Sequence, residues 1–172
     1  MTVIVETLFY TKTKNMKPDI GISSSHLKKV ADILSLVLSD AVILYTKTRK
    51  FHWNVKGESF MEYHKLFENQ YKQLEEAIDE IAERINKLGS PAIGTLQEFM
   101  EKGSIKETPG KYPSSKEMVK ELLNDHESVV KALRGYIDEC DDKLSDVGTA
   151  DFLTSLLAAH ETIAWTLRRY MD

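Results

Sequence analysis

Apolar residues recur along most of the chain at intervals of three and four positions, which is the spacing of helices with one buried face. Only eight glycines and four prolines interrupt this pattern. Near the middle, Thr95 and Glu98 have the spacing of a capping box, which marks a helix start. We therefore predict four long helices and one short one, over residues 26–55, 59–88, 95–102, 114–144 and 150–170. The pattern predicts an all-α protein.

The lengths of the connections indicate how the predicted helices are arranged. Those after the first and third long helices are short, so each of these pairs is expected to be antiparallel. The connection at residues 89–114 is long enough to cross a bundle and to let the second and third long helices run parallel. One such crossover in a four-helix bundle is the ferritin-like arrangement. We expect one bundle domain over residues 26–172, with the short helix in its crossover, preceded by an N-terminal arm at residues 1–25.

The composition excludes several kinds of site and of protein. The chain of 172 residues has a single cysteine, which excludes an internal disulfide and a cysteine-based zinc cluster. Its 27 acidic and 23 basic residues give a net charge of -4, which argues against a protein that coats DNA with its whole surface. No apolar run reaches the roughly 18 residues of a membrane span, and residues 1–25 lack the features of a signal peptide. We therefore expect a cytoplasmic protein with no membrane partner.

The histidines do not indicate a metal site inside one bundle. Di-iron bundles of that kind use Glu-x-x-His on two helices, and no histidine here has a glutamate three residues before it. The helix predicted at residues 59–88 carries a different pattern. Two pairs of side chains fall within an arc of roughly 100° around its axis, namely His64 with Glu68 and Asp79 with Glu83. The two pairs are about 22 Å apart along the axis, so one copy of the helix cannot close a site from both.

Two copies of this helix can close such a site if they pack antiparallel about a two-fold axis. The His64 pair of one copy then faces the Asp79 pair of the other, and symmetry produces two equivalent sites. His52, at the end of the first helix, is positioned to join the His64 pair. This mixture of imidazole and carboxylate ligands suits Fe(II), Zn(II) or Mn(II). The alternative interpretation is that Asp79 and Glu83 form an ordinary solvated face and that His64 is structural.

A specific motif surrounds these residues. Residues 52–57 read HWNVKG, residues 79–84 read DEIAER, and Phe60, His64 and Glu68 lie between them. The motif and its spacing resemble the signature of the Dps family, the mini-ferritins named as DNA-binding proteins from starved cells. The resemblance extends over about residues 26–172. Two positions depart from the commoner family pattern, since Tyr63 replaces a small aliphatic residue and Glu68 replaces Asp while keeping the carboxylate.

The resemblance implies a hollow homo-oligomeric shell of twelve subunits, built on two-fold dimers with ferroxidase sites at their interfaces. The implied metal ligands are His52, His64 and Glu68 of one subunit with Asp79 and Glu83 of its partner. The family binds Fe(II) there, oxidises it, usually with hydrogen peroxide, and stores ferric iron in the shell, which limits oxidative damage. The resemblance therefore implies an enzyme that binds iron and oxidises it. Zinc or manganese could occupy the same ligands.

Several further residues have two interpretations. Trp53 is either an electron donor beside the metal site or part of the core. Asp142, Asp146 and Asp151 surround the turn into the last helix and resemble the acidic residues of the family's ferritin-like pores, where a negative funnel attracts cations. The alternative for these three is ordinary helix-end chemistry.

The remaining candidates lie on the last two helices. His126, His160 and Glu161 are either accessory ligands or surface and interface residues. Cys140 is expected to be a buried small residue.

DNA binding is the family's other activity, and in members that bind DNA it often depends on a lysine-rich terminal tail. The arm at residues 1–25 has three lysines, which two acidic residues offset, and the chain is acidic overall. A nucleoid-associated, DNA-compacting scaffold with secondary metal chemistry is therefore the alternative hypothesis, and we favour the iron-oxidising one.

Overall fold

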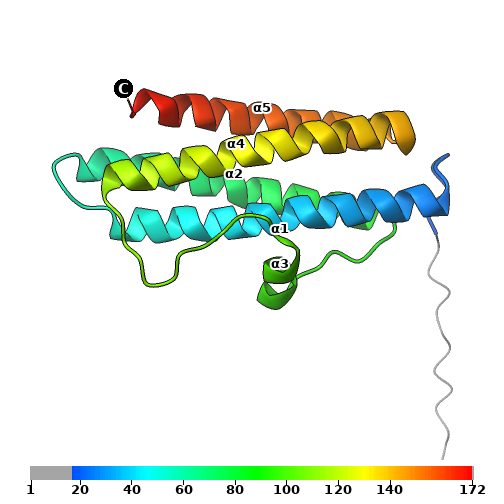
Figure 1. The fold of residues 1–172 in the computed structure, drawn as a ribbon. Coiled ribbons are helices and arrows are strands. Elements are labelled where there is room, and N and C mark those ends of the chain that lie inside the picture. The colour runs from blue at the N-terminus through cyan, green and yellow to red at the C-terminus, as the bar shows by residue number, and fades with distance from the viewer. Residues whose placement is uncertain (1–16, 172) are drawn as a thin grey trace, which may run out of the picture.

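The regular structure of the described part of the chain is entirely helical. The computed structural model describes residues 17–171. Its elements are α1 (Ser24–Asn54), α2 (Phe60–Lys87), α3 (Leu96–Lys102), α4 (Ser115–Asp138), the π-helical turn η1 (Glu139–Lys143) and α5 (Val147–Arg169). The four long helices form a bundle, and the short α3 lies outside it in the crossover between α2 and α4 (Figure 1). The predicted all-α bundle with a short extra helix in its crossover is confirmed.

Residues 1–16, which make up most of the arm expected at residues 1–25, lie outside the described residues. The division of the chain into an arm and a bundle domain therefore stays a prediction. Within the described part, Pro18 lies against the end of α2, where a Cβ added to Gly89 would be 2.5 Å from the proline ring.

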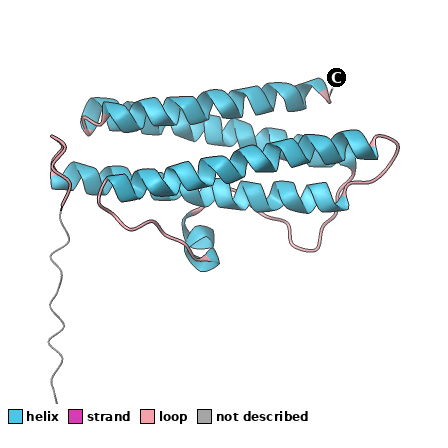
Figure 2. Cartoon of the chain, turned by 180° about the vertical axis from the view of Figure 1, so that it is seen from behind, coloured by secondary structure: helices cyan, strands magenta, loops and turns pink. Residues whose placement is uncertain are grey.

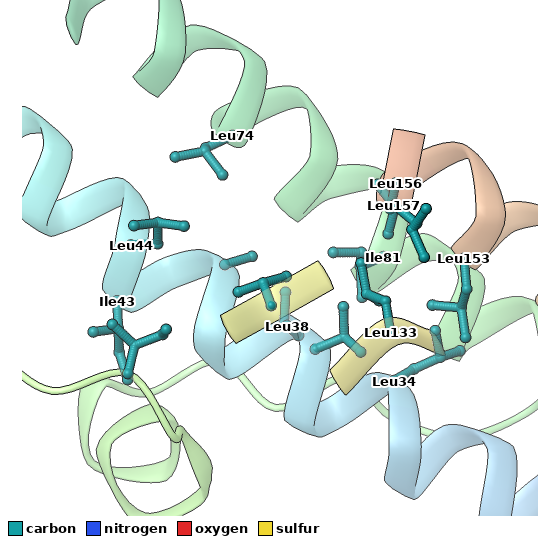
Figure 3. Packing of buried hydrophobic residues seen from close by; sticks show 14 of the residues in the cluster. Leu34, Leu38, Ile43, Leu44, Leu74, Ile81, Leu133, Leu153, Leu156 and Leu157 are labelled. Carbon is teal, nitrogen blue, oxygen red and sulfur yellow. The ribbon is translucent and has the colours of Figure 1, made fainter. Parts of the chain in front are cut away.

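The apolar faces of the four long helices meet in one core. Burial of this surface removes it from water, which is the main favourable contribution to folding. Leucines and isoleucines from α1, α2, α4 and α5 pack together at its centre (Figure 3), among them Leu34, Leu38, Leu44, Leu74, Ile81, Leu133 and Leu153. No helix between residues 17 and 171 is long and apolar enough to cross a membrane.

Side-chain caps determine where two of the helices begin. Thr95 with Glu98 and Ser114 with Glu117 form the two capping boxes that the sequence predicts, each with both of its hydrogen bonds present. A capping box satisfies backbone N–H groups that have no partner within the helix. The observed starts of α3 and α4 are consequently within one position of the predicted starts.

The start of α5 differs from the prediction. We expected it at Ala150, on the assumption that Gly148 and Thr149 break the chain, but α5 begins at Val147. Asp146 is its N-cap, and the carboxylate accepts hydrogen bonds from the backbone N–H (2.9 Å) and the hydroxyl (2.7 Å) of Thr149. These bonds satisfy donors in the first turn, so the helix forms before Gly148 rather than after it.

A buried carboxylate holds the crossover against the bundle. Asp40 of α1 accepts hydrogen bonds from the backbone N–H of Ser104 (2.5 Å), from its hydroxyl (2.7 Å) and from the N–H of Ile105 (3.1 Å). Gly103 permits this close approach, because a Cβ there would lie 2.3 Å from the side chain of Ile43. Figure 2 shows from the opposite side how the crossover loops flank α3. The contacts of Asp40 and Gly103 thus fix the path of the crossover over α1.

Candidate metal centre

Two histidines meet where α1 ends and α2 begins. His52 lies in the last turn of α1 and His64 in the first turns of α2. The connection between these helices turns at Gly57, whose φ of 116° is a conformation that other residues rarely adopt. This short turn brings the two imidazoles together, with ring centroids 3.7 Å apart and an angle of 20° between the ring planes.

Each of these histidines is oriented by the backbone of the other. Nδ1 of His52 is 2.8 Å from the carbonyl oxygen of His64, and Nδ1 of His64 is 2.9 Å from the carbonyl oxygen of His52. A carbonyl oxygen only accepts hydrogen bonds, so both Nδ1 atoms must carry the proton. In the neutral imidazoles both Nε2 atoms are therefore unprotonated and able to bind a metal ion.

Aromatic rings hold this pair in place. His52 is almost fully buried, and the ring of Tyr71 contacts it edge-on at a centroid distance of 5.2 Å. Phe60 packs against His64 at 5.0 Å. Because neither imidazole is free to turn, the two Nε2 atoms have a defined placement before any metal binds.

Glu68 lies one turn along α2 from His64 and already interacts with two cations. Its two carboxylate oxygens accept hydrogen bonds from the ammonium groups of Lys65 (2.6 Å) and Lys72 (2.8 Å). These bonds, with Lys65 as the larger cause, lower the pKa of Glu68 to about 2. The carboxylate is consequently ionised at any physiological pH, and it attracts positive charge.

Asp79 and Glu83 lie near the other end of α2. Both are exposed, and Glu83 forms an ion pair with Lys87 at 3.0 Å. Because α2 is one continuous helix, His64 and Asp79 lie on a shared face but about 22 Å apart along its axis. Within residues 17–171 of the single chain, no three His, Cys, Asp or Glu side chains lie together as a metal-binding group. The structure thus brings His52 and His64 together, with Glu68 one helical turn from His64 on α2, and it leaves Asp79 and Glu83 elsewhere.

Sequence reasoning missed an arginine that lies within an aromatic cluster beside the histidines. The guanidinium of Arg49 lies over the rings of Tyr71 (4.9 Å), Tyr45 (5.4 Å) and Trp53 (5.4 Å), and it donates a hydrogen bond to the hydroxyl of Tyr45. The side chain of Trp53 is 65% exposed in the single chain, so the interpretation of Trp53 as a core residue is wrong. Its role as an electron donor stays a prediction. Tyr45, Arg49 and Trp53 lie one helical turn apart on α1, a signal that could have been noticed, whereas Tyr71 comes from α2.

The three acidic pore candidates have different surroundings. Asp142 and Asp151 are exposed. Asp146 is buried, caps α5 and forms an ion pair with Arg84 at 3.0 Å. Asp146 therefore stabilises the start of a helix, which was the alternative interpretation of this residue. A pore role for the three residues stays a prediction.

His126 and His160 lie inside the bundle, between α4 and α5. Their Nδ1 atoms are 2.9 Å apart, and both side chains are buried, so the expectation of surface or interface residues is wrong for them. Burial lowers the pKa of His126 well below its ordinary value and that of His160 to about 4. Glu161 is on the surface and pairs with Arg134 at 2.5 Å.

Cys140 is fully buried, as predicted, and burial raises the pKa of its thiol to about 11.

Comparison with known proteins gives a consistent result. The model of the ferritin-like domain matches residues 31–172. A low temperature-induced protein of Nostoc sp. is 41% identical over 154 residues, which span 90% of this chain and 86% of that protein. A DNA protection during starvation protein of Brevibacillus brevis is 37% identical over 146 residues, or 83% of this chain and 95% of the relative.

A solved structure agrees with these sequence matches. The Dps protein of Vibrio cholerae, described as a member of a broad superfamily of ferritin-like diiron-carboxylate proteins, superposes with a TM-score of 0.85 at 25% identity. The match covers 91% of this chain and 97% of that one. The chain therefore belongs to the Dps family of ferritin-like proteins.

Proposed function

We propose that the protein binds Fe(II) at a site shared between two copies of the chain, oxidises it with hydrogen peroxide, and stores the ferric product in a dodecameric shell. The observation that carries this proposal is the reciprocal bonding of His52 and His64, which leaves both Nε2 atoms able to bind a metal. The description of the Vibrio cholerae relative as a diiron-carboxylate protein supports the choice of iron.

The side chains available to such a site fit Fe(II) as a substrate. His52 and His64 supply nitrogen ligands, and Glu68 supplies an ionised carboxylate that is already bonded to two cationic groups. Asp79 and Glu83 of a second copy would complete the set if two α2 helices pack antiparallel about a two-fold axis. Mixed imidazole and carboxylate ligands favour borderline divalent ions, so Zn(II) and Mn(II) would compete for the same place.

The proposed reaction uses both oxidising equivalents of one peroxide. Two Fe(II) ions each lose one electron, the O–O bond of hydrogen peroxide breaks, and two protons are taken up to give two waters and two Fe(III). The one-electron reduction of peroxide would instead release hydroxyl radical. A site that delivers both electrons removes Fe(II) and peroxide together, and this removal is the protective function that we propose.

Exposed apolar side chains around the histidine pair support assembly with a second copy. Trp53 (65%), Phe60 (38%) and Met61 (60%) are exposed in the single chain and lie within a few residues of His52 and His64. Large apolar side chains grouped on a surface mark an interaction site. A second copy that covers them would bring its own α2 to the incomplete metal site. Membership of the Dps family is the basis for proposing a shell of twelve such copies.

Iron oxidation at low loading tests the proposal. We expect the variant His52→Ala/His64→Ala to oxidise Fe(II) with peroxide about tenfold or more slowly than the parent, because it lacks both nitrogen ligands. His26→Gln is a suitable control, since His26 bonds to the carbonyl of Leu144 (3.1 Å) and belongs to no part of the site. Equal rates for the double variant and the parent would contradict the assignment.

The name of the Brevibacillus brevis relative, DNA protection during starvation protein, fits this function. Removal of Fe(II) and peroxide would protect DNA without any contact with it. We therefore propose that the protein acts in the cytoplasm, where the chromosome lies. A DNA-compacting scaffold would instead retard duplex DNA in a gel, less strongly as salt concentration rises. Unchanged mobility of DNA at low salt would exclude that alternative.

A further inference from the structure

Lysines accompany two of the three carboxylates that the proposed site would use. Lys65 and Lys72 each bond to a different oxygen of Glu68, at 2.6 Å and 2.8 Å. Lys87 bonds to Glu83 at 3.0 Å. All three lysines are exposed in the single chain, with 57–63% of each side chain accessible, whereas the carboxylate side chain of Glu68 is only 19% exposed.

The charge of the assembled site explains why such lysines matter. A two-fold interface brings Glu68 of one copy together with Asp79 and Glu83 of the other, so three negative charges meet in one place. Like charges at close range repel, and partial burial strengthens the repulsion. The ammonium groups of Lys65 and Lys72 from one copy and of Lys87 from the other supply an equal positive charge. Within this group of three carboxylates and three lysines, the charges thereby cancel without a metal ion.

We infer that Lys65, Lys72 and Lys87 are internal counter-ions of the shared site, which hold its carboxylates in the metal-free shell and are displaced when a divalent ion binds. This inference rests on the proposed function and adds the regulation of metal affinity to it. An ion that binds must first separate the ammonium groups from Glu68 and Glu83, so the lysines lower the affinity of the site. Weaker binding favours onward movement of the oxidised iron from the interface.

The lysine side chains are suited to such an exchange. Exposed ion pairs on a helix contribute little to stability, so they separate readily, and a released lysine regains its solvation and its freedom of rotation. The ion pair between Lys47 and Asp125 is different, because its side chains are only 7% and 18% exposed. That pair lies between α1 and α4, and its separation would leave charges buried. The pairs at the metal site can therefore open without disturbing the core.

Binding of a redox-inert metal tests the inference without any oxidation step. The variant Lys65→Met/Lys72→Met keeps most of each side-chain stem and removes both charges from Glu68. We expect its affinity for Co(II), measured by calorimetry on the assembled protein at constant pH and ionic strength, to rise roughly threefold to thirtyfold above the parent. An affinity equal to that of the parent would overturn the inference.

Two controls separate this effect from a general change in charge. Lys28→Met removes an exposed pair with the four-residue spacing of Glu68 and Lys72, between Lys28 and Asp32 at 2.8 Å on α1, and should leave the affinity for Co(II) unchanged. Adding His52→Ala/His64→Ala to the lysine variant should abolish the gain. A gain that persists without the histidines would show that the extra Co(II) binds elsewhere, and it would overturn the inference.

The state of assembly gives a second readout. In buffer with a chelator, the lysine variant should dissociate at higher protein concentrations than the parent, because the carboxylates repel without counter-ions, and Zn(II) should restore its assembly. Analytical ultracentrifugation measures both effects. Equal assembly of both proteins in chelator would contradict the counter-ion role. If the parent itself binds no Co(II), the proposed function fails. The comparison of parent and lysine variant by ultracentrifugation in chelator still decides whether the lysines stabilise the metal-free interface.

Discussion

At the scale of single residues, the chain contains two histidine pairs with opposite properties. His52 and His64 each donate Nδ1–H to the other's backbone carbonyl, which makes Nε2 the metal-binding nitrogen of each neutral ring. His126 and His160 instead bond to each other through Nδ1 inside the bundle, at 2.9 Å. The first pair can accept a cation from outside, whereas burial keeps the second pair neutral.

The buried pair makes stability depend on pH. Burial lowers the pKa of His160 from 6.5 to about 4 and also lowers the pKa of His126. The unfolded chain therefore binds these protons at a higher pH than the folded chain does. The stabilising contribution is complete above about pH 6.5 and is lost as pH falls towards 4, by about 3 kcal/mol for His160.

Thermal unfolding measured between pH 7 and 4 checks this dependence. We expect the unfolding temperature of the parent to fall more steeply than that of His160→Phe, which keeps an aromatic ring but cannot bind the proton. The difference between the two curves separates this contribution from those of carboxylates and of other histidines. Parallel curves would contradict the account of the buried pair.

At the scale of elements, the sequence predicted helices well where local interactions decide their limits. The apolar period marked each long helix, and the boxes at Thr95 and Ser114 marked two starts. The start of α5 was missed because Asp146 and Thr149 form a cap without the glutamate of a capping box. The start of α5 is thus also fixed by local hydrogen bonds, but the prediction looked only for capping boxes and not for a cap formed by Asp146 and Thr149.

The candidate site could be predicted only in part, for a physical reason. A continuous helix fixes the angle between its own side chains, so the shared face of His64 and Glu68 on α2 followed from their spacing. The stacking of His52 on His64 and the position of Arg49 among aromatic rings depend on how α1 packs against α2. The pairing of His126 with His160 depends in the same way on the packing of α4 against α5. Spacing along one helix carries no information about such contacts.

The cap of α5 should be a major contributor to stability at the level of elements. Asp146→Ala removes the cap and leaves Arg84 and Thr149 without their carboxylate partner. We expect a loss of about 2–4 kcal/mol in the free energy of unfolding, measured with denaturant. Asp142→Ala, at an exposed position of η1, should change it by less than about 0.5 kcal/mol. Similar effects of the two substitutions would contradict the importance of this cap.

At the scale of the whole molecule, one chain presents separated parts of a metal site. His52, His64 and Glu68 lie near one end of α2, and Asp79 and Glu83 lie near the other. Exposed apolar side chains lie close in sequence to the two histidines of the first group, and lysines accompany Glu68 and Glu83. In the proposed assembly, two copies of α2 complete two sites at once, so the dimer is the smallest unit that can oxidise iron.

The shared site is best tested by a crystal structure of the protein soaked with Fe(II) or Zn(II), with metal positions taken from anomalous scattering. We expect two metal-containing sites at each two-fold interface. Each site would be bounded by His52, His64 and Glu68 of one copy and by Asp79 and Glu83 of the other. Metal bound wholly within one chain, or an interface that keeps the two groups of ligands apart, would contradict it.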